Sequence, residues 1–282
     1  MTTRRDFLSV VGAASVVGAL PDVRGWPAVA TEAKIKRIGL QLYTVRDLMA
    51  HDVDGTLATV AKIGYREVEF AGYFDRPPHL LREKIESLGM TSPASHIDLH
   101  ELETNFDATA AAAKALGNKW LIVAWLEMKE YPKSADWKKL AARFTALGRR
   151  AHDAGLRFAY HNHDFGFARV DGIVPYDTLV AESDPKYVDF EMDLYWIIKA
   201  GGKPLDYFAK YPGRFPMVHV KDGMGAPSWK MADVGGGTID WAKIFTKRKQ
   251  AGIQHFFVEH DDPADPIASI RASYGYLSHL TF

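Results

Sequence analysis

The chain has 282 residues, of which 47% are hydrophobic and 25% are charged, so it can bury a large core. Its 35 basic and 35 acidic residues give a formal net charge of zero, which argues against nucleic acid or an anionic membrane as partner and favours a small molecule. Cysteine is absent, which excludes disulfides, cysteine nucleophiles and thiolate zinc sites, so any metal ligand must be His, Asp or Glu.

The first thirty residues differ from the rest of the chain. Arg4-Arg5 precedes a mildly apolar run over 10–20, and residues 28–30 have the small-x-small form of a cleavage site. The segment resembles a twin-arginine signal peptide, which implies the Tat export machinery and a periplasmic or otherwise exported protein. The alternatives are a disordered tail or an internal helix, and the apolar run is too short for a membrane span. We predict a signal peptide over 1–30 and a mature domain over 31–282.

Short β-branched or aromatic runs alternate with helical patterns after this segment. The expected strands cover 36–42, 67–70, 91–96, 120–124, 157–161, 188–193, 215–220 and 256–259. The expected helices cover 54–63, 78–88, 105–116, 134–154, 204–210, 240–251 and 263–280. Glycines such as Gly117 and Gly252 end helices just before strands. Eight strands alternating with helices, without a linker, predict one α/β domain, a (β/α)8 TIM barrel.

Polar residues gather where the expected strands end, and the carboxyl ends of the strands form the active face of such a barrel. Because side chains alternate along a strand, residues two apart share a face. This pairs His161 with His163, Glu191 with Asp193, and His219 with Lys221.

Ionisable groups converging from neighbouring strands would repel one another or be desolvated unless a cation lies among them. A single strand-end Asp or His is more often a cap, but several strand ends in register favour a metal site. We predict a divalent metal bound by Asp193, His219 and Glu259. These ligand types fit manganese, magnesium, cobalt or zinc without choosing among them.

Other rim residues have two interpretations each. His96, His161 and His163 contact substrate or catalyse, or else they hydrogen-bond to neighbouring protein groups. Glu69 binds substrate or pairs with an arginine such as Arg46. Aromatic side chains near the rim stack on the apolar face of a sugar or pack the barrel. The aromatic candidates are Tyr43, Trp125, Tyr195 and Trp196, and Gln41 is a further candidate for substrate binding.

The order and position of several segments resemble the sugar phosphate isomerase/epimerase family, the xylose isomerase-like barrels. The resemblance covers nearly the whole mature chain. The segments are 39–46, 64–69, 160–165, 192–196, 219–222, 233–240 and 257–259.

The resemblance implies a divalent metal bound by a strand-five acid and by Asp, His and Glu on the next three strands. The last three correspond to Asp193, His219 and Glu259. Relatives with a His-Asn-His turn tend to have Glu shortly after it, where this sequence has Gly166. The fourth ligand is therefore left open among His161, His163, Asp164 and water.

The resemblance further implies an isomerase or epimerase that removes a proton next to a sugar carbonyl through a metal-stabilised enediolate. Glu259 or His163 would act as base, His96 or His161 would orient hydroxyls, and Lys221 would offset negative charge. Elimination on the same site would make a dehydratase, a lyase or a keto-glycoside hydrolase. Barrels of this family often pair, so a homodimer is an expectation.

Two alternatives belong to other classes of protein. A non-catalytic periplasmic carbohydrate-binding protein is one, and the glycine at position 166 favours it. A nuclease is the other, and the neutral charge balance argues against it.

Overall fold

Residues 33–282 are the part of the chain that the computed structural model describes, and they contain eight parallel strands. The strands are β1 (Gly39–Gln41), β2 (Glu67–Ala71), β3 (Ala94–Ile97), β4 (Trp120–Val123), β5 (Arg157–His161), β6 (Val188–Asp193), β7 (Met217–Val220) and β10 (His255–Val258). They close in the order β1-β10-β7-β6-β5-β4-β3-β2. Each strand pairs with the strands before and after it in this order, all in parallel, and the barrel closes where β1 pairs with β2 as well as with β10. The predicted (β/α)8 barrel is confirmed.

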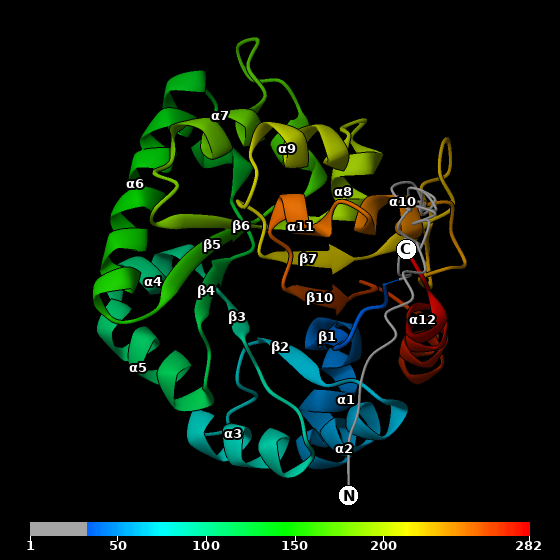
Figure 1. Cartoon of the computed structure of the whole chain (residues 1–282). Coiled ribbons are helices and arrows are strands. Elements are labelled where there is room, and N and C mark those ends of the chain that lie inside the picture. Colours follow the sequence, from blue (N-terminus) through cyan, green and yellow to red (C-terminus); the bar gives the residue numbers. More distant parts are fainter. Residues whose placement is uncertain (1–32) are drawn as a thin grey trace, which may run out of the picture. The chain divides into compact units, whose positions relative to one another are not determined.

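Helices lie outside the ring of strands (Figure 1). The longer ones are α2 (Val53–Ile63), α3 (Pro78–Ser87), α5 (Phe106–Leu116), α6 (Ser134–Asp153), α7 (Pro175–Glu182), α9 (Pro204–Lys210) and α12 (Pro266–His279). The shorter ones are α1 (Arg46–His51), α4 (Leu99–Thr104), α8 (Leu194–Lys199), α10 (Trp241–Phe245) and α11 (Arg248–Ala251). Three 3-10 turns, η1 (Leu42–Val45), η2 (Met128–Glu130) and η3 (Asp164–Phe167), and a hairpin of β8 (Asp222–Gly223) with β9 (Met231–Ala232) lie in the loops.

The helical prediction is right for the longer helices except α7, and it does not include the short helices α1, α4 and α8. The expected helix over 240–251 is divided into α10 and α11. No helix was expected between β5 and β6, where α7 begins with Pro175 at a first-turn position that needs no N–H donor. The predicted glycine ends hold at Gly117 and Gly252, which cap α5 and α11 in the left-handed conformation.

Two layers of side chains inside the barrel position the site. The lower layer is an apolar cluster made by Ala94, Trp120, Ile122, Ala159, Met217 and Phe257. Two residues further along four of the same strands, and therefore on the same face, come His96, His161, His219 and Glu259. The polar layer thus rests on a packed apolar floor below the C-terminal rim.

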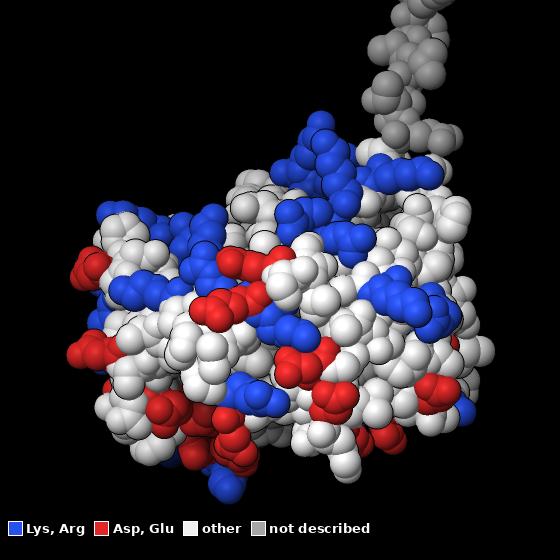
Figure 2. All heavy atoms as spheres, turned by 90° about the horizontal axis from the view of Figure 1, so that it is seen from below, with Lys and Arg blue, Asp and Glu red and all other residues white. Residues whose placement is uncertain are grey.

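Lys, Arg, Asp and Glu side chains share the face of the molecule drawn in Figure 2. Within residues 33–282, no helix is long and apolar enough to cross a membrane. The signal peptide predicted over 1–30 lies outside the described residues, so it and the domain boundary at residue 31 stay predictions.

Candidate active site

The three predicted metal ligands lie together at the top of the barrel. Asp193 ends β6 and caps α8, where its Oδ1 accepts from the backbone N–H of Trp196 at 2.8 Å. Its Oδ2 accepts no hydrogen bond from residues 33–282. His219 Nδ1 donates to Glu259 Oε2 at 2.8 Å. One ligand atom from each of Asp193, His219 and Glu259 falls within 4.8 Å of the others, which is close enough to share one ion.

Lys221 lies among the same carboxylates. Its Nζ is 2.8 Å from Glu259 Oε2, 3.2 Å from Asp193 Oδ2 and 2.7 Å from Asp261 Oδ1. Burial alone would lower the pKa of Lys221, but Asp193, Glu259 and Asp261 outweigh it and raise the pKa well above its usual value. A fixed ammonium therefore relieves part of the carboxylate repulsion that the sequence argument assigned to a metal ion alone.

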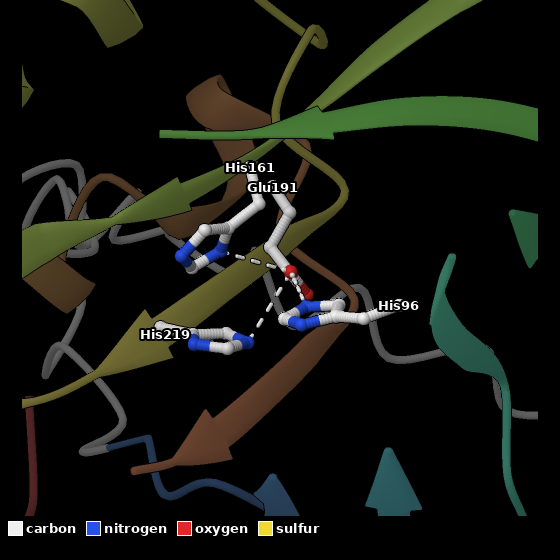
Figure 3. Close-up of side chains that lie close together, drawn as sticks. All are labelled: His96, His161, Glu191 and His219. Carbon is white, nitrogen blue, oxygen red and sulfur yellow. Dashed lines mark hydrogen bonds and ion pairs between the residues drawn. The ribbon is translucent and has the colours of Figure 1, made fainter. Parts of the chain in front are cut away.

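Glu191 is the centre of a second cluster, which it forms with His96, His161 and His219 (Figure 3). Its Oε2 accepts from His96 Nε2 at 3.0 Å and from His161 Nδ1 at 3.1 Å, and it lies 3.2 Å from His219 Nε2. Burial would raise the pKa of Glu191, but the three histidines lower it well below the usual range. The sequence placed Glu191 on the face of Asp193 without choosing it for the site, and that shared face is the signal that could have found it.

Glu69 and Gln41 form the far side of this second cluster. Gln41 Nε2 donates to Glu69 Oε2 at 2.7 Å, and His219 Nε2 donates to the same oxygen at 2.8 Å. Both side chains are fully buried, so a direct role in holding substrate would need an open path to them. The alternative pairing of Glu69 with Arg46 is wrong, because Arg46 Nη1 donates to the backbone oxygens of Tyr43 and Asp261.

The histidines differ in charge because their neighbours differ. Burial alone would lower the pKa of His96, but Glu69 and Glu191 raise it to about 9. Carboxylates at both ring nitrogens likewise outweigh burial and raise the pKa of His219. Burial and the nearby His219 lower the pKa of His161 well below its usual value.

His163 stands apart from the ionic pairs. Burial, aided by the charge of Lys221, lowers its pKa to about 3, so the imidazole is neutral. Its Nδ1 has no hydrogen-bond partner among residues 33–282. Such a ring is a weak base, and it is better suited to hydrogen-bonding a substrate hydroxyl.

A cavity of about 430 Å³ opens above the polar layer, in the size range of small-ligand sites. Trp125 and Tyr43 are 56% and 42% exposed there, and Trp125 packs edge-on against His163 with ring centroids 5.1 Å apart. The lining residues are Tyr43, His96, Ala124, Trp125, His161, His163, Asp164, Phe165, Trp196, Glu259 and Asp261. Polar groups therefore form the floor, and aromatic rings form much of the wall.

The sequence candidate Tyr195 and the neighbouring residue Asp222 have structural roles instead. Tyr195 is buried, donates its hydroxyl to the backbone oxygen of Trp229, and does not line the cavity. Asp222 follows Lys221 and faces the opposite way, where it accepts from Gly235 N at 3.0 Å and Trp241 Nε1 at 2.9 Å. It thereby fixes the loop over 233–240, which sequence comparison had singled out only as a motif.

The donor set fits a divalent cation. Five carboxylates surround one lysine and the histidines, and Asp193 Oδ2 is buried without a hydrogen bond from residues 33–282. Carboxylate oxygens and imidazole nitrogens suit manganese, cobalt and zinc, and the oxygens suit magnesium. Asp193, His219 and Glu259 could hold such an ion, and their role as ligands stays a prediction.

A closed parallel barrel with an ionic cluster and an open cavity at the carboxyl ends of its strands defines a (β/α)8 barrel of the enzyme type. Residues 57–278 match the xylose isomerase-like TIM barrel family, and the chain belongs to that family.

Among curated relatives, an inosose dehydratase of Lacticaseibacillus casei is 25% identical over 179 residues, spanning 56% of this chain and 59% of that protein. The chain thus spans about three fifths of this relative's length. An inosose dehydratase of Geobacillus thermodenitrificans is 23% identical over 247 residues, spanning 74% of this chain and 82% of that protein. A solved sugar phosphate isomerase/epimerase of Parabacteroides distasonis is 26% identical with a TM-score of 0.77, covering 87% of this chain and 99% of that one. A solved IOLI protein with a bound zinc atom shares the fold at 17% identity and a TM-score of 0.68, over 85% of this chain and 95% of that one.

Proposed function

We propose that this protein removes a proton from a carbon next to a carbonyl in a small carbohydrate or cyclic polyol, with a divalent metal ion at Asp193, His219 and Glu259. The observation that carries the proposal is the ionic cluster on the floor of a cavity walled by aromatic rings. A bound divalent ion supplies a Lewis acid, which polarises the carbonyl and stabilises negative charge on its oxygen. The zinc atom in the IOLI neighbour supports the choice of a divalent ion.

The protein's own residues divide the remaining work. Glu259 lines the cavity and is the group we assign as base, because Lys221 and His219 outweigh burial, lower the pKa of its carboxyl group and keep it ionised; His163 lines the same cavity and is the alternative base. Lys221 keeps its charge paired with Asp261 at 2.7 Å when an ion occupies the other carboxylates. From there it offsets the negative charge that develops on the substrate.

The wall of the cavity orients the sugar. Trp125 and Trp196 offer ring faces to apolar C–H groups, and His163 offers a ring nitrogen to a hydroxyl. His96 carries a positive charge at neutral pH, so it donates hydrogen bonds to the cluster or to a substrate oxygen.

Two outcomes follow from one proton abstraction. Return of the proton to a different face or carbon gives an epimerase or isomerase, while loss of a neighbouring hydroxyl gives a dehydratase. The names of the relatives favour both readings: sugar phosphate isomerase/epimerase for one solved structure and inosose dehydratase for the curated proteins.

Conversion assays in deuterium oxide test the proposal. Purified protein, with chelator or with added manganese, is incubated with free sugars, cyclic keto-polyols and 3-keto glycosides. Deuterium in the recovered substrate or product establishes proton abstraction. An unchanged product mass, apart from deuterium, identifies an isomerase or epimerase, and a product lighter by one water identifies a dehydratase. Sugar binding that chelator does not alter, without conversion or deuterium uptake, would instead identify a carbohydrate-binding protein.

Export is a separate part of the proposal and rests on the sequence of residues 1–30. Changing Arg4-Arg5 to two lysines is expected to keep the protein in the cytoplasm, as cell fractionation would show. Wild-type protein found only in the cytoplasm would overturn the proposal of export.

A further inference from the structure

Glu191 divides the three histidines around it into two kinds. All three direct one ring nitrogen at Glu191 Oε2, at 3.0 to 3.2 Å (Figure 3). What distinguishes the three rings is where the other nitrogen lies. A histidine that binds a metal commonly gives its second N–H to a carboxylate, which fixes the tautomer and the ring orientation.

The second nitrogens of His161 and His219 lie on the side of the metal-binding carboxylates. His161 Nε2 is 4.0 Å from Asp193 Oδ2, and His219 Nδ1 is 2.8 Å from Glu259 Oε2. Ligands about 2.0–2.1 Å from a tetrahedral zinc ion are about 3.3 Å apart, so the nitrogen of His219 is already near this separation, and the ring of His161 must move closer to share the ion with all three residues. His96 differs, because its Nδ1 lies 3.4 Å from the amide nitrogen of Gln41 and away from those acids.

We propose that His161 Nε2 is the fourth protein ligand of the divalent ion, and that Glu191 is the positioning residue that holds His161 and His219 for binding. The inference rests on the proposed metal site at Asp193, His219 and Glu259. It assigns the ligand that the sequence left open.

The surroundings of Gly166 support this assignment. A Cβ at this position would meet the Cβ of Tyr176, on α7, at 3.9 Å, and no other heavy atom of residues 33–282 within 4 Å apart from its chain neighbours. Gly166 itself has no side chain, so it supplies no ligand at the position where relatives tend to have Glu. His161 ends β5 and lines the cavity, so it occupies the strand-five position facing Asp193.

A second placement of the ion competes with this one. His96, His161, Glu191 and His219 also bring one ligand atom each within 4.8 Å of one another. Two members of each set line the cavity, His96 and His161 in one and His161 and Glu259 in the other, so access does not separate the two placements. The sets differ in charge, because the competing set has one carboxylate and the proposed set has two, Asp193 and Glu259, and two carboxylates suit a doubly charged ion better.

Cobalt(II) binding tests the inference, because the visible spectrum of bound cobalt reports its ligands. Affinity and spectrum are measured for the wild type and for His161→Ala, Glu191→Gln and His96→Ala, with circular dichroism to check folding. His161→Ala is expected to weaken cobalt binding at least about tenfold and to change the spectrum. Glu191→Gln is expected to weaken binding about 10–100-fold, the usual effect of losing an outer-shell partner. His96→Ala is the matched control, since its ring touches the same Glu191 oxygen, and it is expected to bind like the wild type within about threefold.

Each other result has a defined meaning. Wild-type affinity and spectrum in folded His161→Ala would overturn the assignment of His161 while leaving the three-ligand site intact. Equal losses in His96→Ala and His161→Ala, with cobalt retained in Asp193→Asn, would place the ion in the second cluster and overturn the inference. Failure of the wild type to bind cobalt or manganese would overturn the metal site of the proposed function itself. If Glu191→Gln does not fold, Glu191→Asp replaces it, because it shortens the side chain that holds the histidines and is expected to weaken binding in the same direction.

Discussion

Both ends of the barrel interior hold buried acidic side chains. At the lower end, Asp189 and Glu67 are both paired with basic side chains, whereas some acids at the upper end have an oxygen without a hydrogen bond from residues 33–282. Below the apolar layer, Asp189 accepts from Arg157 Nη2 at 2.7 Å through one oxygen, and from Arg157 Nε and Trp120 Nε1 through the other. Nearby, His255 Nδ1 donates to Glu67 Oε2 at 2.8 Å. Each of these carboxylates is paired with a basic side chain, Asp189 with Arg157 and Glu67 with His255.

The upper end contains acids with one carboxylate oxygen that accepts no hydrogen bond from the part of the chain that the structure describes. Within the described residues, Glu69 Oε1, Glu191 Oε1 and Asp193 Oδ2 are buried and accept no hydrogen bond. Leaving a buried oxygen without a hydrogen bond costs about 1–3 kcal/mol, although Asp193 Oδ2 gains part of this back from the ammonium of Lys221 at 3.2 Å. The two ends therefore differ in how fully their acids are hydrogen-bonded, and this difference supports the proposed ligand site at the upper end.

Removing one histidine at each end gives the sharpest contrast. His219 and His255 both donate from Nδ1 to a glutamate at 2.8 Å. His219→Ala is expected to lower turnover by about three orders of magnitude or more and to abolish metal uptake, because it removes a ligand. His255→Ala is expected to keep kcat within about twofold and to lower the free energy of unfolding by about 1 kcal/mol. Steady-state assays, metal analysis and denaturation measure the pair, and full activity in His219→Ala would remove the basis of the site.

Replacing Lys221 is expected to distinguish the role of the lysine charge from that of the metal ion. Lys221→Met keeps the length of the side chain but removes the charge that offsets negative charge on the substrate, so kcat should fall about a hundredfold. Metal affinity should rise severalfold, because the ammonium 2.8 Å from Glu259 Oε2 no longer repels the ion. A loss of metal together with activity would instead make the lysine part of the metal site's support, and Lys221→Arg provides a variant that retains the charge.

The lower network is expected to respond in stability alone. Asp189→Ala leaves Trp120 Nε1 and Arg157 without their acceptor, so the free energy of unfolding should fall by about 2–3 kcal/mol. For a domain of this size that is a drop in Tm of about 5–10 °C, measurable by calorimetry or circular dichroism. Activity of the folded enzyme should stay within about twofold. A large fall in kcat at a temperature where the variant is folded would contradict the division between the two ends.

The barrel was predictable from sequence because its signals are local. Strand lengths, helix periodicity and the glycines at positions 117 and 252 each report on a few neighbouring residues. The missed helix α7 is short, with eight residues between two loops, and gives a weak periodic signal. The division of the predicted helix over 240–251 is a matter of a few residues that tertiary packing decides.

The site was predictable in part, because strand alternation brings Asp193, His219 and Glu259 to one face and the barrel brings the faces together. Pairing between side chains on distant strands could not be read in the same way. That Glu191 gathers three imidazoles, and that Lys221 bridges three carboxylates, depends on side-chain directions across the barrel. No local pattern encodes those directions.

The smallest expected effect is at the rim of the cavity, where Trp125 is expected to contact the substrate and not the ionic cluster. Trp125 is 56% exposed and packs edge-on against His163, so it can be removed without opening the core. Trp125→Ala is expected to raise KM about 3–10-fold, the loss of one stacking face, with kcat within about twofold. Trp125→Phe should recover most of the affinity, because a ring face is restored without the indole N–H that now donates to Glu127. A fall in kcat at unchanged KM would contradict this expectation. It would mean that Trp125 affects the catalytic step through His163 and does not only bind substrate.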